Sequence, residues 1–245
     1  MHISAIKIKA FALCLLSIVT HIQTQAQSDN FQLGANNVTV ICDNADVGDT
    51  GNIVGEIYTK RSKDQITTNN ASTTCTSGIT SMDSLFYDST AFNADISTWD
   101  VSDVTTMKSM FRDAISFNGD ITSWNVENVT DMSEMFRGAS SFNQDLNSWD
   151  VSRVKDMNYM FQNARKFDKD ISDWEVDSVT DMSYMFFNAD AFNRDLSTWC
   201  VAQIGSAPTF FRNPGTDPVW GTCPVLRREI SVSYTHLRAH ETEAY

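Results

Sequence analysis

Histidine, glycine and long apolar runs are scarce in this chain, and each shortage excludes a class of protein. The four histidines lie near the two ends, at His2, His21, His236 and His240. The body of the chain therefore offers no Ser-His or Cys-His pair for nucleophilic catalysis. Only ten residues are glycine, whereas repeated calcium loops need Gly at each sharp turn. Beyond residue 26 no apolar run reaches the roughly 20 residues that span a bilayer.

Positive charge is also in short supply. The chain has 18 Lys and Arg against 31 Asp and Glu, which gives a net charge of −13. Nucleic acids and anionic membranes repel a body of this charge, so we expect neither as a partner. The short apolar runs predict no transmembrane segment. The acidic balance suits solubility outside the cell.

The two ends of the chain differ from its body. Residues 1–26 are predicted to be a signal peptide, because Lys7 and Lys9 precede a short apolar stretch from Ala10 to Val19, and Thr24 and Ala26 are small residues suited to a cleavage site after residue 26. Residues 226–245 have no periodicity and resemble translated sequencing-adapter text, so we expect a non-native tail there. We also expect export, which makes the chain secreted or displayed at the cell surface.

What the chain has in abundance is a 25-residue unit, repeated five times without insertion or loss. The period is visible in Trp, Asp, Phe and Met ladders. Two of these are Trp99, Trp124, Trp149, Trp174 and Trp199, and Asp95, Asp120, Asp145, Asp170 and Asp195. A strict period of this length predicts stacked supersecondary units that form a solenoid over residues 79–211. Such a repeat presents the same groups at every step, whereas an active site needs one unlike set of groups.

Each unit is predicted to contain a short parallel strand and a short helical turn. Residues 121–126 alternate in a way that favours an extended stretch. Val129, Met132, Met135 and Phe136 share the spacing of one helix face. Because the ladder positions do not vary, their side chains are expected to point inward and to stack on the next copy.

Non-repetitive segments flank the repeats and are predicted to be caps. Residues 27–78 form the N-terminal cap, with strands at 38–41 and 53–58 and a turn between them marked by Gly48, Gly51 and Asn52. Residues 212–225 form the C-terminal cap. Phe210 and Phe211 still occupy their repeat positions, after which prolines end the regular pattern.

Four cysteines remain after the signal peptide, two before the repeats and two at their end. Three connectivities are open. We favour the local pairs Cys42–Cys75 and Cys200–Cys223, because the intervening coils would hold the two pairs far apart. A zinc site is the alternative, although the spacings contain no CxxC pair.

Three further features could carry function. The Asp ladder could bind calcium through stacked oxygens, but hydrogen bonding to backbone N–H groups in turns is the favoured interpretation. The Trp ladder could be a sugar platform, but buried core is favoured. Aromatic residues that replace polar ones in later copies are the best interaction candidates. They are Tyr159, Tyr184 and Phe187.

The amino-acid sequence of the repeats resembles that of the BspA-like leucine-rich-repeat (LRR) surface proteins. The resemblance is visible in segments such as 96–102, 141–146 and 179–186. More narrowly, the sequence resembles the 25-residue repeat once catalogued as a mycoplasma domain of unknown function. The resemblance covers about residues 79–211. It implies an LRR-like solenoid on a secreted or surface-exposed bacterial protein, and relatives linked to adhesion. It supplies no catalytic residues and no cofactor.

The sequence thus predicts a non-catalytic module that mediates adhesion or binds an extracellular protein or glycan. Two alternatives stay open: a passive spacer for a lost C-terminal domain, and a glycan-active enzyme that uses ladder carboxylates.

Overall fold

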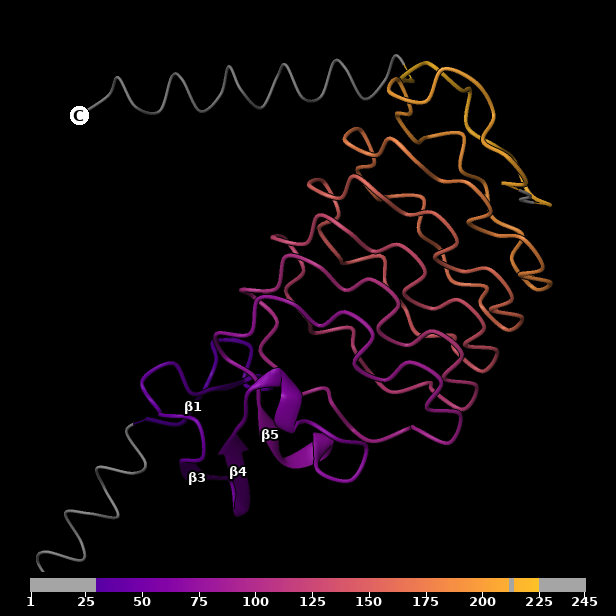
Figure 1. Cartoon of the computed structure of the whole chain (residues 1–245). Coiled ribbons are helices and arrows are strands. Elements are labelled where there is room, and N and C mark those ends of the chain that lie inside the picture. The colour runs from indigo at the N-terminus through magenta and orange to yellow at the C-terminus, as the bar shows by residue number, and fades with distance from the viewer. Residues whose placement is uncertain (1–29, 212–213, 225–245) are drawn as a thin grey trace, which may run out of the picture.

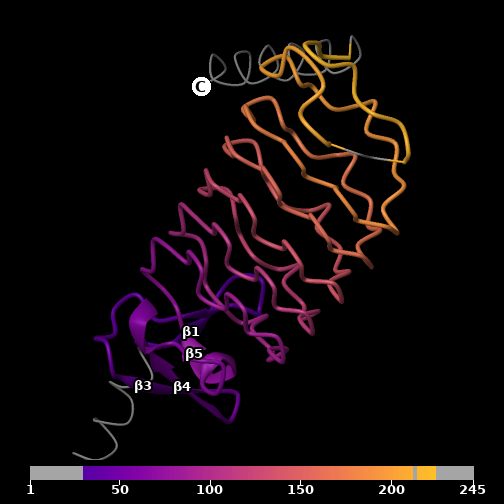
Figure 2. The ribbon, with the colours of Figure 1, turned by 45° about the vertical axis from the view of Figure 1, so that its right-hand side comes forward.

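The computed structural model describes residues 30–211 and 214–224. From the N-terminal strands onward the chain runs in successive turns that stack along one axis, which the colour change in Figure 1 follows. Figure 2 shows the same stack from another side, with equivalent parts of successive coils lying next to one another. The predicted signal peptide and tail lie outside the described residues.

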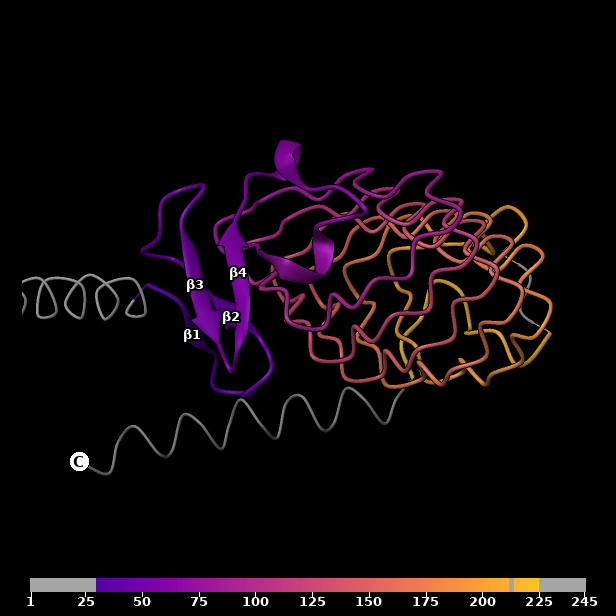
Figure 3. The same ribbon diagram turned by 90° about the horizontal axis from the view of Figure 1, so that it is seen from below.

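The N-terminal part contains two small sheets. Strands β1 and β2 pair antiparallel, and the second sheet has the order β3-β4-β5, with β3 antiparallel and β5 parallel to β4. Figure 3 shows these strands beside the first coils of the stack. The elements are β1 (Gln32–Leu33), β2 (Val40–Ile41), β3 (Thr50–Ile53), β4 (Glu56–Lys60), η1 (Lys63–Gln65), η2 (Ala71–Thr73) and β5 (Thr74–Cys75).

The predicted strand over residues 53–58 is wrong as a single element. It is interrupted by a turn at Val54 and Gly55, whose φ angles are 52° and 93°. Gly51 and Asn52, which were predicted to mark the turn, lie inside β3. The prediction of a single strand failed because apolar residues lie on both sides of a tight hairpin turn and resemble one continuous strand. Gly55 is the residue that readily adopts the turn conformation.

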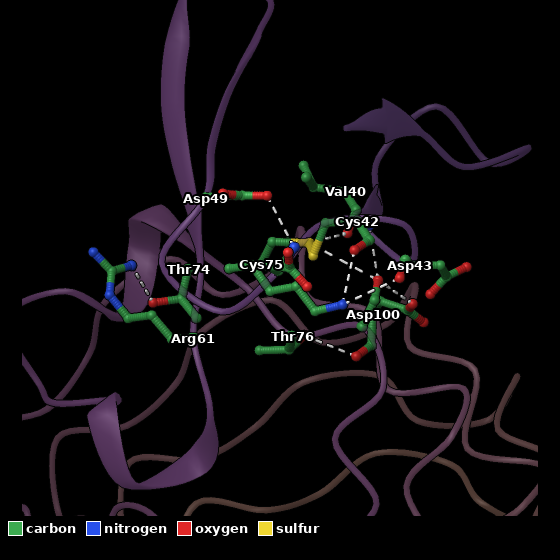
Figure 4. The surroundings of a disulfide bond; sticks show 12 residues. Val40, Cys42, Asp43, Asp49, Arg61, Thr74, Cys75, Thr76 and Asp100 are labelled. Carbon is green, nitrogen blue, oxygen red and sulfur yellow. Dashed lines mark hydrogen bonds between the residues drawn. A yellow bond between two sulfur atoms is a disulfide. The ribbon is translucent and has the colours of Figure 1, made fainter. Parts of the chain in front are cut away.

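Side-chain hydrogen bonds join the N-terminal part to the first coil. Ser77 Oγ donates to Asp100 Oδ2 at 2.7 Å, and Thr76 Oγ1 donates to the Asp100 carbonyl at 2.8 Å. In Figure 4 Thr76 and Asp100 lie beside the disulfide between Cys42 and Cys75. Residues 30–78 therefore cover one end of the stack through specific contacts.

Each coil bonds to the next through a parallel bridge at one position. The bridge runs through Ser81, Thr106, Asp131, Asp156 and Asp181. Beside it, alternate backbone N–H groups donate to the following coil, as Glu134 does to Asn158 and Phe136 to Met160. The repeat period is thus expressed directly as hydrogen bonding between copies. The strand predicted over residues 121–126 is wrong, since residues 122–123 form a turn. The bridges lie instead in the half of the unit that was predicted to be helical, as at Asp131.

The predicted helical turn over residues 129–136 is wrong. This segment is a series of tight turns in which Met135 N–H donates to the Met132 carbonyl and Glu134 has a φ of 58°. A left-handed residue cannot continue a right-handed helix. Successive three-residue turns also place Met132, Met135 and Phe136 inward, so the apolar spacing alone did not distinguish the two structures.

The ladders form one continuous core, as predicted. The five Trp side chains are at most 4% exposed. Each indole Nε1 donates to a backbone carbonyl of the preceding segment, for example Trp149 to Ile121 at 3.2 Å. The Phe rings stack within and between coils, with Phe136 and Phe142 centroids 3.9 Å apart. The Trp ladder is therefore core and not a sugar platform.

The C-terminal segment packs on the last coil. The disulfide between Cys200 and Cys223 joins the two, and the Trp220 ring meets Phe211 edge-on at 4.8 Å. A Cβ at Gly215 would collide with the Arg194 carbonyl, so only glycine permits this close approach. Across the described ranges, no helix is long and apolar enough to cross a membrane.

Candidate interaction surface

The Asp ladder is used in turns. In every coil the ladder carboxylate accepts the N–H two residues later, as Asp120 does from Thr122 and Asp145 from Asn147, both at 3.0 Å. These bonds lower the pKa of Asp170, whose main partner is Ser172 N–H. Within the described part of the chain, no group of three or more His, Cys, Asp or Glu side chains is placed to hold a metal ion.

The bridge column contains a second set of carboxylates with different surroundings. Asp156 lies between Asp131 and Asp181 in the stack. Burial raises the pKa of Asp156, and repulsion from the carboxylates of Asp131 and Asp181 raises it further. The hydrogen bond from the Asn158 N–H lowers this pKa and so opposes the rise. The oxygens of these residues accept N–H groups from their own turns, as Asp131 does from Ser133. They are therefore turn-forming residues as well.

The structure brings the three predicted interaction residues together. The Tyr159 and Tyr184 rings are stacked, with centroids 4.7 Å apart and planes 6° apart. Phe187 meets Tyr184 edge-on at 5.8 Å. All three are partly exposed. They come from two successive coils, where the repeat stacking sets their spacing close to that of hydrogen-bonded strands.

Sequence reasoning missed a fourth aromatic residue, Phe210. It was expected to keep its repeat position, which in the coils before it is a buried Met. Phe211 keeps its buried repeat position. Phe210 does not, because its side chain is 54% exposed and its φ angle is 49°. Its ring stacks on Tyr184 at 5.0 Å and meets Phe187 edge-on at 5.6 Å. The change from Met to Phe in this column was the available signal.

Charged groups extend the row toward the N-terminal end. The Arg137 guanidinium lies over the Tyr159 ring at 5.2 Å. Arg137 Nη1 and Arg112 Nη1 both lie 2.7 Å from Glu134 Oε2, and Arg112 in turn lies over Tyr87 at 5.1 Å. The residues thus form one row along the stack, which we term the aromatic file. It comprises Tyr87, Arg112, Glu134, Arg137, Tyr159, Tyr184, Phe187 and Phe210.

Backbone conformation makes the two tyrosines unusual. Tyr159 and Tyr184 have φ angles of 56° and 59°. This position is left-handed in every coil, and the others carry Ser84, Ser109 and Glu134. A bulky side chain is uncommon in this region, where Gly, Asn and Asp are favoured. Strained conformations of this kind cluster at functional sites.

Charge is distributed unequally around each coil. The halves that carry the aromatic file (79–91, 104–116, 129–141, 154–166 and 179–191) hold six bases and eight acids. The other halves (92–103, 117–128, 142–153, 167–178 and 192–203) hold three bases and thirteen acids. The file therefore lies on the less acidic side of a strongly acidic body.

These features define a repeat protein with an aromatic and charged row on one side. Comparison with known families gives two overlapping matches, at residues 56–169 and 124–216, to "Mycoplasma protein of unknown function, DUF285". The matches span more than half of the chain. The chain belongs to this family. No curated protein and no solved structure matched it significantly.

Proposed function

We propose that this protein is a secreted or cell-surface interaction module without catalytic activity. In this proposal it is an LRR-like solenoid of the BspA-like type that binds an extracellular protein or glycan through the aromatic file. The observation that carries the proposal is the stacked set Tyr159, Tyr184 and Phe210, which places partly exposed rings where earlier coils have polar or buried residues.

Export is supported by the two disulfides. Cys42–Cys75 and Cys200–Cys223 are of a kind that persists in oxidising compartments and is rare in the cytosol. The LRR-like assignment is supported by the parallel bridge that recurs once per coil. A non-catalytic role is supported by the ladder carboxylates, which accept hydrogen bonds in their own turns and are the same at every step.

A binding screen on glycan and extracellular-matrix arrays, with and without calcium, tests this proposal. Saturable binding is expected, and the triple variant Tyr159→Ser, Tyr184→Ser, Phe187→Ser should lose it. The matched control is Val54→Ser with Ile57→Ser in the N-terminal hairpin, since these apolar side chains are also exposed. Equal loss in both variants would place the site elsewhere.

The remaining outcomes separate the alternatives. Binding only in the presence of calcium would move the site to the Asp ladder. Degradation of an arrayed glycan would favour the glycan-active enzyme. Absence of binding under both conditions would contradict the proposal and favour a passive spacer.

A further inference from the structure

The faces of the two tyrosine rings in the aromatic file are covered. Tyr184 lies between Tyr159 at 4.7 Å and Phe210 at 5.0 Å, and Tyr159 lies between Tyr184 and the guanidinium of Arg137. Sugar rings bind aromatic residues through open faces. The two tyrosines instead present ring edges, which are the positive part of the aromatic quadrupole.

The polar groups of the file are mainly donors. Glu134 Oε2 is shared by Arg112 and Arg137, and Asp113 Oδ2 lies 3.5 Å from Arg112 Nε. The side chains of these arginines are 27% and 31% exposed. Each guanidinium has five N–H donors, of which Glu134 and Asp113 use only some. Within the described part of the chain, the hydroxyls of Tyr159 and Tyr184 make no hydrogen bond.

From these observations we infer that the partner is a polypeptide segment that combines carboxylates with apolar side chains and lies extended along the file. Its carboxylates would accept hydrogen bonds from Arg112 and Arg137, since guanidinium and carboxylate geometries match. Its apolar side chains would pack on Phe187 and Phe210, which have no polar group to bind a sugar hydroxyl. This inference rests on the proposed function and specifies the partner.

The length of the file sets the length of the segment. Arg112 and Phe210 are about four coils apart, or about 19 Å at the spacing of neighbouring strands. An extended chain rises about 3.3 Å per residue, so about six residues cover this distance. The charge distribution bears on where such a segment binds, because an acidic segment meets less repulsion at the halves with six bases and eight acids than at the halves with three bases and thirteen acids.

Selection from a random-peptide phage library on the full chain tests the inference. The expected peptides place Asp or Glu a few residues from Leu, Ile or Phe. For one such synthetic peptide, Arg112→Gln with Arg137→Gln should weaken binding about ten-fold or more, and added salt should weaken the binding of the wild type more than that of this variant. Tyr184→Ser with Phe210→Ser should weaken binding by a similar factor.

Arg153→Gln with Lys169→Gln is the charge-matched control, because both residues lie on the acidic side. This variant should bind the peptide as the wild type does. Circular dichroism should show that each variant is folded before binding is measured.

Three outcomes would overturn the inference: selection of basic or uncharged peptides, no enrichment at all, or equal effects of the arginine variant and its control. Retained array binding that depends on Tyr159 and Tyr184 would then show that the proposed function survives with a different partner class. Loss of array binding as well would contradict both.

Discussion

The rings of Tyr159 and Tyr184 stack at 4.7 Å although both residues have left-handed backbone conformations, with φ angles of 56° and 59°. The two facts oppose one another energetically. Stacking of an aromatic pair contributes about 0.5–1.5 kcal/mol, whereas a bulky residue at positive φ costs about 1–2 kcal/mol. The pair is therefore of little use to the fold, which is consistent with a role in binding.

The double variant Tyr159→Asn, Tyr184→Asn should consequently lower the free energy of unfolding by no more than about 1 kcal/mol, because Asn tolerates the left-handed region at both positions and this relief offsets the lost stacking. Urea unfolding measures this value, and the array measures binding, which should be lost. A destabilisation above about 3 kcal/mol would instead identify the rings as core residues.

Trp149 should behave in the opposite way. It is 3% exposed and donates its indole N–H to the Ile121 carbonyl. Trp149→Ala should reduce the free energy of unfolding by about 3–5 kcal/mol, as for other buried aromatic residues.

Trp149→Phe is the matched variant. It retains most of the apolar area and removes one hydrogen bond, while the Ile121 carbonyl still accepts the Trp124 N–H. A smaller loss of about 0.5–1.5 kcal/mol is therefore expected. A cost below about 1 kcal/mol for Trp149→Ala would be incompatible with a buried ladder.

The repeat period made the core predictable but not the path of the backbone. Invariant Trp, Phe and Met positions had to be buried, because each copy is too small to bury its own apolar face and stability comes from neighbours. The interaction candidates Tyr159, Tyr184 and Phe187 could be selected from the sequence because they depart from the polar residues of earlier copies. Their mutual contact followed from stacking of the copies.

The predicted helix failed for a physical reason. The spacing of Met132, Met135 and Phe136 is satisfied equally by a helix and by successive tight turns. The deciding feature is the left-handed conformation of Glu134, for which Glu gives no signal. The exposure of Phe210 was missed for a related reason. In the last coil the residue with left-handed backbone conformation lies one position later than in the other coils, and this shift moves the Phe210 ring from the core to the surface.

The contributions of Asp156 and Asp170 to the free energy of unfolding should depend on pH in opposite directions. Burial raises the pKa of Asp156, whereas N–H and hydroxyl donors of Ser172 lower that of Asp170. The folded state therefore holds the Asp156 proton more tightly than the unfolded state. The resulting contribution to stability is present below the unfolded pKa of about 3.9 and is lost as pH rises through the folded value. For Asp170 the contribution is present above about pH 3.9 and is lost as pH falls through the folded value.

Urea unfolding of Asp156→Asn and Asp170→Asn at about pH 7 and about pH 3 tests this difference. Relative to the wild type, Asp156→Asn should be more stable at neutral pH than at acid pH. Asp170→Asn should show the reverse order. The same order in both variants would contradict the assigned surroundings of at least one carboxylate.

The disulfide between Cys200 and Cys223 should stabilise the C-terminal end of the stack. It closes a loop with a sequence separation of 23, and restricting an unfolded chain over such a loop contributes about 3 kcal/mol. Cys200→Ser with Cys223→Ser should therefore lower the free energy of unfolding by about that amount. The Cys42→Ser, Cys75→Ser variant should show a loss of similar size, because its loop has a separation of 33 and closure entropy grows slowly with length.

Reduction supplies the control for the cysteine variants. A reductant should destabilise the wild type by the combined loss, and each double variant only by the loss of the pair it retains. If the Cys200→Ser, Cys223→Ser variant loses as much stability on reduction as the wild type does, this pair contributes nothing. The C-terminal segment would then be held by the contact of Trp220 with Phe211 and by the backbone bonds of residues 216–222 to the last coil.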